Sequence, residues 1–347
     1  MLSRRQLMAF ASAGVLTTAC SSTKAIVPPL AQLATVGVSE SFDPRFDALI
    51  APGTKPEIIV EGMDWSEGPA WDKRRERLLF SDVPQNRVYS WSRDAGLDIF
   101  LEPAGAPHGK PYADMQRGTN GLWYQDDDTL LMCNQAGRSI DRLDLETGRR
   151  TIIVDNDGGK PLNKPNDVVA SSNGIIYFTN PPIGLGGTTA AEERFLDYSA
   201  VYRAGPEGLS IVTRELQTPN GIALSPDERT LYVAQSGKVA PKIMRYFLDE
   251  SGNVTGSDLF FDVQQHPIDG QVGTGDGMSV DRHGNLFFCA VDIGTLVISS
   301  QGDLLGRIFT GRKMSNCVFG EDGSTLFITA DDLILRVPTL TRGMTFS

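Results

Sequence analysis

Six polar side chains stand at corresponding positions of a motif that recurs through the sequence. In each copy a short apolar run follows the polar residue, then a turn rich in Asp, Asn, Gly or Ser, then a second apolar run. All six side chains carry oxygen, and none is Lys, Arg or His. Carboxylate and amide oxygens are the ligands that a hard divalent cation such as Ca²⁺ prefers, taking about six to eight of them. The six residues are Glu67, Asn120, Asn166, Asn220, Asp276 and Asn316.

The two carboxylates of this set, Glu67 and Asp276, would balance the charge of a dication. The alternative is that Asn-Gly and Asp-Gly begin these segments because such residues favour turns. That alternative explains the glycines well, but it explains Glu67 badly because Glu is a poor turn former. The sequence therefore predicts a metal site if the fold brings the six positions together.

The recurring motif is typical of a β-hairpin. Its first residues are 40 to 56 positions apart, a period close to that of propeller blades and too long for a helical solenoid. We therefore predict an all-β fold, a six-bladed β-propeller with a central metal site, over residues 56–347. The first strand of each blade lines the central channel, so the six side chains are expected to form a ring at one end of it.

The sixth copy supplies one strand fewer than the others. It ends after "LILRVPTL", and no further strand precedes Ser347. The segment "KPEIIVEG", residues 55–62, stands just before the first copy and has the character of a strand. We predict that it completes the last blade and closes the ring, which removes exposed sheet edges.

The N-terminus resembles an export signal. Arg4 and Arg5 match the twin-arginine pattern, and the apolar stretch at 7–19 is too short to span a bilayer. Ala19-Cys20 resembles a lipoprotein cleavage site, although Thr17 stands where Leu is usual. We expect residues 1–20 to be a signal peptide, 21–55 a linker, and the protein exported to the periplasm. Lipid anchoring through Cys20 and soluble release are the two alternatives.

The charge and the cysteines narrow the class of protein further. The net charge is −11, and no basic run of consequence follows residue 5, which argues against nucleic acid or an anionic membrane surface as a partner. The other three cysteines lie in apolar stretches without paired or metal-type spacing, so we predict buried, unpaired thiols. They are Cys133, Cys289 and Cys317.

Several motifs occur together in a recognisable order. They are "EGPAW" from Glu67, "NKPND" from Asn163, "FTNPP" from Phe178, "PNGIALSPD" from Pro219 and "DGM" from Asp276. Together they resemble the SMP-30/gluconolactonase/LRE family of six-bladed propellers, which is related to the paraoxonase-like hydrolases. The resemblance extends over about residues 57–340.

The resemblance implies a metal-dependent hydrolase that opens a sugar-derived or related lactone, a carboxylic ester hydrolase. It implies a divalent metal, most often Ca²⁺ with Zn²⁺ or Mn²⁺ as alternatives, and Asp276 as the group that activates or orients water. Asn120 would lie near the metal or contact the substrate, and Asn316 would line the channel. The implied metal ligands are Glu67, Asn166, Asn220 and Asp276.

This chain departs from the family pattern at one point. Relatives often have Glu-His after the second-blade strand, whereas Asn134-Gln135 stands here, which puts in doubt any contact that needs a histidine there. His108 and His266 lie on loops before the second and fifth copies of the motif, and His283 is predicted to be solvated in a turn.

Two further predictions concern loops. Asp167 is expected to tether the loop beside Asn166. The insertion at 183–200 would cover the pocket, with Arg194 and Phe195 contacting substrate, or would be a surface loop.

Two other functions stay open at this stage. One is hydrolysis of other esters or phosphotriesters on the same metal site. The other is a non-catalytic propeller that binds a ligand, since a fold does not compel chemistry. No Gly-x-Ser-x-Gly elbow is present, so a serine-hydrolase mechanism is disfavoured.

Overall fold

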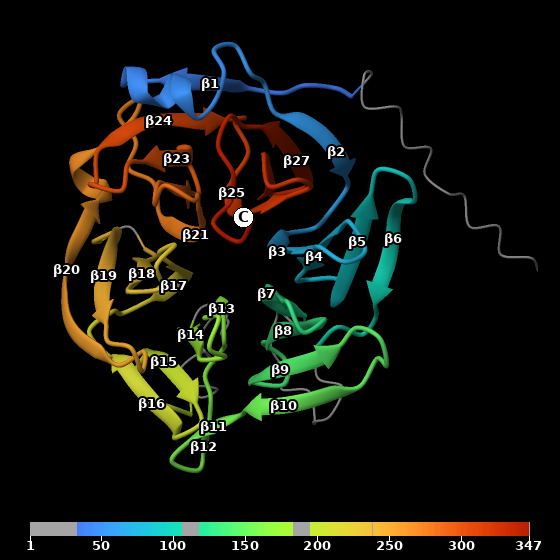
Figure 1. Cartoon of the computed structure of the whole chain (residues 1–347), viewed down its shortest axis with the longest axis vertical. Coiled ribbons are helices and arrows are strands. Elements are labelled where there is room, and N and C mark those ends of the chain that lie inside the picture. The colour runs from blue at the N-terminus through green and yellow to red at the C-terminus, as the bar shows by residue number, and fades with distance from the viewer. Residues whose placement is uncertain (1–32, 106–117, 183–194, 238, 347) are drawn as a thin grey trace, which may run out of the picture.

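The computed structural model describes residues 33–105, 118–182, 195–237 and 239–346. Six antiparallel sheets of four or five strands stand around a central axis (Figure 1). The prediction of an all-β, six-bladed propeller is therefore confirmed.

The consecutive strands of each blade run in chain order from its inner edge outward, and in blades 5 and 6 a strand from the N-terminal part of the chain is added at the outer edge. Blade 1 contains β3 (Ser66–Asp72), β4 (Arg77–Asp82), β5 (Arg87–Ser92) and β6 (Gly96–Leu101), and blade 2 contains β7 (Thr119–Gln125), β8 (Thr129–Asn134), β9 (Ser139–Asp144) and β10 (Arg150–Val154). Blade 3 contains β13 (Val168–Ala170), β14 (Ile176–Asn180), β15 (Ala200–Gly205) and β16 (Gly208–Thr213), and blade 4 contains β17 (Pro219–Leu224), β18 (Thr230–Gln235), β19 (Lys242–Leu248) and β20 (Val254–Asp262). Blade 5 contains β21 (Gly275–Val280), β22 (Leu286–Ala290), β23 (Gly294–Ile298) and β24 (Leu304–Phe309), and blade 6 contains β25 (Met314–Gly320), β26 (Thr325–Ala330) and β27 (Leu333–Pro338). A ribbon of β11 (Asn156–Asp157) and β12 (Lys160–Pro161) connects blades 2 and 3, and the 3-10 turn η4 (Val263–Gln265) follows β20.

The first strand of a blade is irregular where the recurring polar residue stands. In blade 1 the pairing with β4 shifts between Glu67 and Ala70. The first hairpins of blades 2, 4, 5 and 6 shift at the corresponding place. Such a bulge bends the strand and re-aims its side chains, so the irregularity belongs to the site and not only to the fold.

The ring closes through the strand before the first blade, as predicted. β2 (Glu57–Glu61) pairs with β27, and Figure 1 shows this blue strand against the red C-terminal strands. Ion pairs reinforce the seam: Arg336 lies 2.7 Å from Glu57 and 3.0 Å from Glu321. Glu321 also lies 2.7 Å from Arg93 of blade 1, so its carboxylate ties the last blade to the first.

Replacing Glu321 with glutamine is expected to weaken this closure. Burial alone would raise the pKa of Glu321, but hydrogen bonds from Arg93, Arg336 and Thr325 outweigh it and lower the pKa to about 2. A lowered pKa means that the stabilisation is present above the unfolded pKa of about 4.5 and is lost as the pH falls toward 2. Urea denaturation should show a loss of about 1 to 2 kcal/mol at pH 7 that shrinks at pH 3.

The exposed residue Glu207 provides the control for that measurement. Its replacement by glutamine should change the free energy of unfolding by less than about 0.5 kcal/mol at either pH. An equal loss at pH 7 and pH 3 for Glu321→Gln would contradict the ion-pair explanation.

The expected linker at 21–55 is wrong for residues 33–55. β1 (Val38–Ser41) pairs with β24 as a fifth strand of blade 5, and the 3-10 helix η2 (Pro44–Ala48) follows it. Phe46 and Ile50 are buried in the core shared by blades 5 and 6. The open edge of β24 and these apolar side chains hold the segment on the propeller. Residues 1–20, including Cys20, lie outside the described residues.

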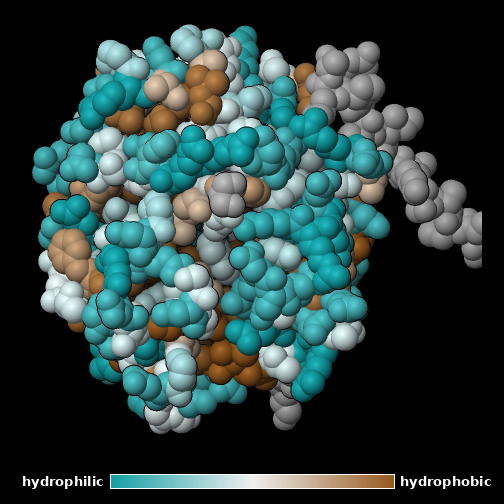
Figure 2. Space-filling model, in the orientation of Figure 1, coloured by the Kyte–Doolittle hydropathy of each residue, from teal (hydrophilic) through white to brown (hydrophobic). Residues whose placement is uncertain are grey.

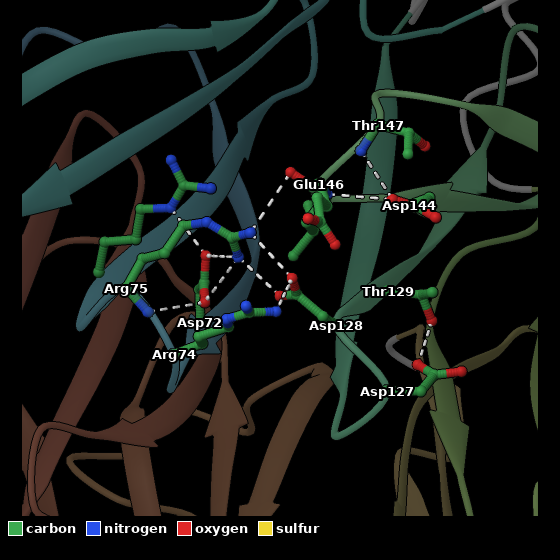
Figure 3. A network of polar contacts seen from close by, with 11 residues as sticks. Asp72, Arg74, Arg75, Asp127, Asp128, Thr129, Asp144, Glu146 and Thr147 are labelled. Atoms are coloured by element: carbon green, nitrogen blue, oxygen red, sulfur yellow. Dashed lines mark hydrogen bonds and ion pairs between the residues drawn. The ribbon is translucent and has the colours of Figure 1, made fainter.

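Apolar cores between neighbouring blades hold the ring together. Trp71 of blade 1 stacks on Phe327 of blade 6, with ring centroids 5.4 Å apart. Polar contacts also join the first hairpin turns of neighbouring blades, and Figure 3 shows Arg75 between Asp72 of blade 1 and Asp128 of blade 2. The three cysteines predicted to be buried and unpaired are so: Cys133, Cys289 and Cys317.

The surface is mostly polar, and the chain has more acidic than basic residues. Figure 2 shows a largely hydrophilic face broken by small hydrophobic areas. Within the four described ranges, no helix combines the length and apolar character needed to cross a membrane.

Candidate metal and catalytic site

The six recurring polar residues are all buried at the starts of the innermost strands. These residues are only 3 to 7 % exposed. Burying six polar groups costs free energy unless they have partners. Their recurrence at one position therefore indicates a functional site. The residues are Glu67, Asn120, Asn166, Asn220, Asp276 and Asn316.

Glycines bring neighbouring members of this set into contact. A Cβ on Gly68 would lie 2.0 Å from the carbonyl oxygen of Asn120, and one on Gly121 would lie 2.7 Å from that of Asn166. Neighbouring inner strands therefore approach backbone to backbone, which only glycine allows.

The same contact recurs on the other side of the channel. A Cβ on Gly221 would lie 2.1 Å from the carbonyl oxygen of Asp276, and one on Gly277 would lie 2.0 Å from the side chain of Asn316. The polar residues of successive blades thus follow one another around one end of the channel.

Glu67 and Asp276 carry mutually unfavourable charges. Burial raises the pKa of Glu67 to about 8, and the charge of Asp167 raises it too. Burial raises the pKa of Asp276 well above its ordinary value, with the charge of Glu67 as the next contribution. Among the described residues, no ion pair from Lys, Arg or His reaches either carboxylate. The described residues therefore do not supply, at this end of the channel, the positive charge that its carboxylates require.

Local hydrogen bonds fix both carboxylates. Trp65 Nε1 donates to Glu67 Oε1 at 3.4 Å, and the backbone N–H of Gly68 donates to Oε2 at 3.2 Å. The Asn220 side chain donates to the carboxylate of Asp276. Both acids are thus held in place by hydrogen bonds from neighbouring groups.

Asp167 is a further buried acid of the channel, and its contacts differ from the loop-tethering role predicted from the sequence. Instead of tethering a loop, its carboxylate accepts from the backbone N–H of Ile222 in blade 4 at 3.4 Å and from Asn316 Nδ2 in blade 6 at 3.5 Å. Burial raises the pKa of Asp167 to about 7. The signal in the sequence is that Asp follows Asn166, where four of the other five copies of the motif have Gly.

The donor set suits a hard divalent cation. Within the described ranges, no three or more His, Cys, Asp and Glu side chains are grouped to hold a metal, because the expected set has only two carboxylates and takes its other oxygens from amides. Carboxylates and amide oxygens without thiol or imidazole favour Ca²⁺ or a similarly hard ion. The residues present therefore fit such a metal, which would also relieve the repulsion between Glu67 and Asp276.

A cavity of about 460 Å³ occupies the channel beyond these residues, toward the turns that follow the innermost strands. Asp167 and Asn316 line it, together with apolar residues such as Leu224 and Met344. The four expected metal ligands do not line it. The cavity is therefore a feature of the rear of the channel, distinct from the end where the carboxylates meet.

The other predicted contacts lie as follows. The ring of Phe195 is 39 % exposed and packs over the guanidinium of buried Arg138, 4.9 Å from its centroid. Arg194 and His108 lie outside the described residues. His266 stacks on Phe261, with centroids 4.4 Å apart, and His283 is exposed in its turn, as predicted.

Comparisons with known proteins agree with this architecture. Residues 65–332 match the model of the SMP-30/Gluconolactonase/LRE-like region. A gluconolactonase from Zymomonas mobilis is 40 % identical over 314 residues, which cover 89 % of this chain and 88 % of the relative. Pentonolactonase XacC from Haloferax volcanii is 24 % identical over 282 residues, covering 80 % and 84 %.

A solved structure gives the same result. The gluconolactonase of Xanthomonas campestris superposes with a TM-score of 0.75 at 30 % identity, covering 88 % of this chain and 97 % of that one. The matched residues span most of the propeller and include all six recurring polar positions. The chain therefore belongs to the SMP-30/gluconolactonase/LRE family.

Proposed function

We propose that this protein hydrolyses the ring ester of a sugar-derived lactone, using a divalent metal held by Glu67, Asn166, Asn220 and Asp276. The observation that carries the proposal is the pair of buried carboxylates, Glu67 and Asp276, which repel each other and have no cationic side chain beside them among the described residues. They occur in a chain 40 % identical to a gluconolactonase over most of its length.

The chemistry divides between the metal and the chain. When bound, the metal would polarise the lactone carbonyl and stabilise the negative charge that develops on its oxygen. We propose that Asp276 would orient the attacking water and accept its proton once the metal is bound; the hydrogen bond from Asn220 to its carboxylate supports this role. Glu67, held by Trp65 and Gly68, supplies the second negative charge. Asn120 would contact the substrate from the neighbouring blade.

Ca²⁺ is the ion we propose, with Zn²⁺ and Mn²⁺ as alternatives. All donors are oxygens, two of them charged, and a flexible set of this kind matches the coordination of Ca²⁺. Zn²⁺ sites more often contain His or Cys.

Chelation is expected to remove turnover and Ca²⁺ to restore it. After treatment with EDTA, hydrolysis of D-glucono-δ-lactone followed with a pH indicator should fall at least about tenfold, because the charge on the carbonyl oxygen loses its partner. Ca²⁺, Mn²⁺ and Zn²⁺ are then added back separately to rank the ions. Circular dichroism before and after chelation controls for unfolding.

The same experiment distinguishes the alternatives. Full turnover by protein shown to be metal-free would contradict the proposal. Metal binding without lactone turnover, but with hydrolysis of an aryl ester or a phosphotriester, would assign a different substrate class. Metal binding without any hydrolysis would identify a ligand-binding propeller.

We also propose export to the periplasm, with a lipid anchor at Cys20. The support is the sequence pattern of Arg4-Arg5, the short apolar stretch and Ala19-Cys20. Mass spectrometry of the N-terminal peptide from a membrane fraction tests it, since Cys20→Ser should release the protein in soluble form.

A further inference from the structure

The second strand of four blades ends on a buried residue with a polar side chain. In three blades that side chain forms hydrogen bonds with its own turn or with the segment that leads into the same blade. In blade 1 the carboxylate of Asp82 accepts from the N–H groups of Asp64 and Trp65 at 3.1 and 3.3 Å. The four residues are Asp82, Asn134, Asn180 and Gln235.

Blades 2 and 4 follow the same rule with amides. Asn134 Nδ2 donates to Asp141 at 2.9 Å, and its Oδ1 accepts from the N–H of Gly137 at 2.8 Å. Gln235 Nε2 donates to the carbonyl of Ala240 at 2.9 Å, and its Oε1 accepts from the N–H of Gln217 at 3.1 Å. Both amides are thus used on their donor and acceptor sides.

Two buried amides lack such hydrogen bonds. They are Asn180, at the end of β14 in blade 3, and Gln135, directly after β8 in blade 2. Asn180 is 0 % exposed and Gln135 is 1 % exposed. Among the residues that the structure describes, neither the nitrogen nor the oxygen of either amide has a hydrogen-bond partner. Buried polar atoms are rarely left unpaired in native proteins, and each exception requires an explanation such as a missing ligand or water.

The local sequence explains why the loops do not satisfy these amides. Asn180 precedes Pro181 and Pro182, and proline has no N–H to donate. In the turn after β8, the N–H of Gly137 is taken by Asn134 and that of Arg138 by the backbone carbonyl of Gln135. The described residues of these two loops therefore supply no partner for either amide.

Both amides lie beside members of the polar ring. Asn134, next to Gln135, pairs with Thr119, the neighbour of Asn120. The carbonyl of Thr179, next to Asn180, accepts from the N–H of Asn166 at 2.9 Å. The two orphaned amides thus stand at the end of the channel where the expected metal ligands lie.

Hydrogen bonds connect the turn that contains Gln135 with the segment around Asn180, and we call these connected segments the wall of the site. Arg138, in the turn of Gln135, donates from Nη1 to the carbonyl of Asn163 at 2.6 Å. Asn163 in turn binds the N–H of Leu196 and the carbonyl of Tyr198, close to the partner of Asn180 in β15. Blades 2 and 3 therefore present both amides from a single hydrogen-bonded framework.

We propose that Gln135 and Asn180 form a hydroxyl-binding subsite that selects polyhydroxylated lactones over unsubstituted ones. A primary amide both donates and accepts, which matches a hydroxyl group on both counts. A site built to bind a hydroxyl discriminates strongly against an analogue that lacks it, because its buried polar atoms are then left unpaired. The inference rests on the proposed function and names the part of the substrate that this wall recognises.

Variants of nearly the same shape test the subsite in the full, metal-loaded chain. Asn180→Leu and Gln135→Met remove the polar atoms with little change in volume. The kcat and KM are measured for D-glucono-δ-lactone and for δ-valerolactone, which has no hydroxyl groups. Each variant should lower the ratio of the two kcat/KM values by about 10- to 100-fold, mainly through KM for the hydroxylated lactone.

Gln235→Met is the matched control, because that amide occupies the corresponding place in blade 4 with both sides satisfied. It should lower stability and leave the ratio within about twofold. An unchanged ratio in both test variants would overturn the subsite and assign the amides to bound water, whether or not stability changes.

Binding keeps the inference testable if the parent protein opens neither lactone. In that case the proposed function fails, and calorimetry with D-gluconate and 5-hydroxyvalerate replaces kinetics. Tighter binding of D-gluconate by the parent, lost in both test variants and retained in Gln235→Met, would support the subsite. Equal affinity for the two acids, or a preference that survives in the variants, would overturn it.

Discussion

Replacing Asp276 with alanine is expected to lower kcat/KM for D-glucono-δ-lactone by at least about 1,000-fold. The substitution removes a proposed metal ligand and the carboxylate that orients water. It also removes one of two acids whose burial raises their pKa values, and the pKa of Asp276 is further raised by the charge of Glu67. The metal-free variant should therefore be no less stable than the metal-free parent, while Ca²⁺ should stabilise it much less. Kinetics and thermal unfolding with and without Ca²⁺ measure both effects.

Asp281 provides the matched control for Asp276. It is a fully buried aspartate in the same hairpin, but it accepts hydrogen bonds from the backbone of His283 and Asn285 and from Thr341. Asp281→Ala should destabilise the fold by about 1 to 3 kcal/mol and leave the folded protein active and responsive to Ca²⁺. Full turnover by Asp276→Ala would contradict the proposed site.

Most of the fold follows from local pattern. A hairpin repeat can be recognised without knowing its neighbours, and six copies with an unpaired strand at 55–62 determine both the blade count and the closure. The N-terminal arm could not be recognised in this way. β1 pairs with β24, more than 260 residues away, and only a few apolar side chains such as Phe46 anchor it, so its composition resembles that of a linker.

The candidate site was predictable where residue type alone carries the information. Oxygen side chains recur at one position, and a strand start in a propeller faces the channel. The direction of Asp167 depends on its contacts with Ile222 and Asn316 in two other blades, which no local pattern contains. The amides of Gln135 and Asn180 lack hydrogen-bond partners among the described residues. This can be recognised only in the folded structure.

The glycines of the motif had been explained by turn formation, but the structure gives them a second role. Gly221→Ala would place a Cβ 2.1 Å from the carbonyl oxygen of Asp276 and 2.7 Å from Cα of Gly277. Both are backbone atoms of β21, so relief of the clash requires blade 5 to move away from blade 4. We expect a loss of about 3 kcal/mol in the free energy of unfolding. We also expect a fall of about 100-fold in kcat/KM, because Asn220 and Asp276 separate.

Gly256 in β20 is the matched control, since a Cβ there meets only a side-chain carbon of Phe247 at an ordinary 3.5 Å. Gly256→Ala should change stability by less than about 1 kcal/mol and leave kcat/KM unaffected. If Gly221→Ala were destabilised but kept normal turnover in its folded fraction, the contact would hold the blades together without positioning Asp276. If both variants behaved alike, turn preference would suffice to explain the glycines. Loss of turnover and of Ca²⁺ response in Gly221→Ala alone would show that the spacing of blades 4 and 5 sets the geometry of the site.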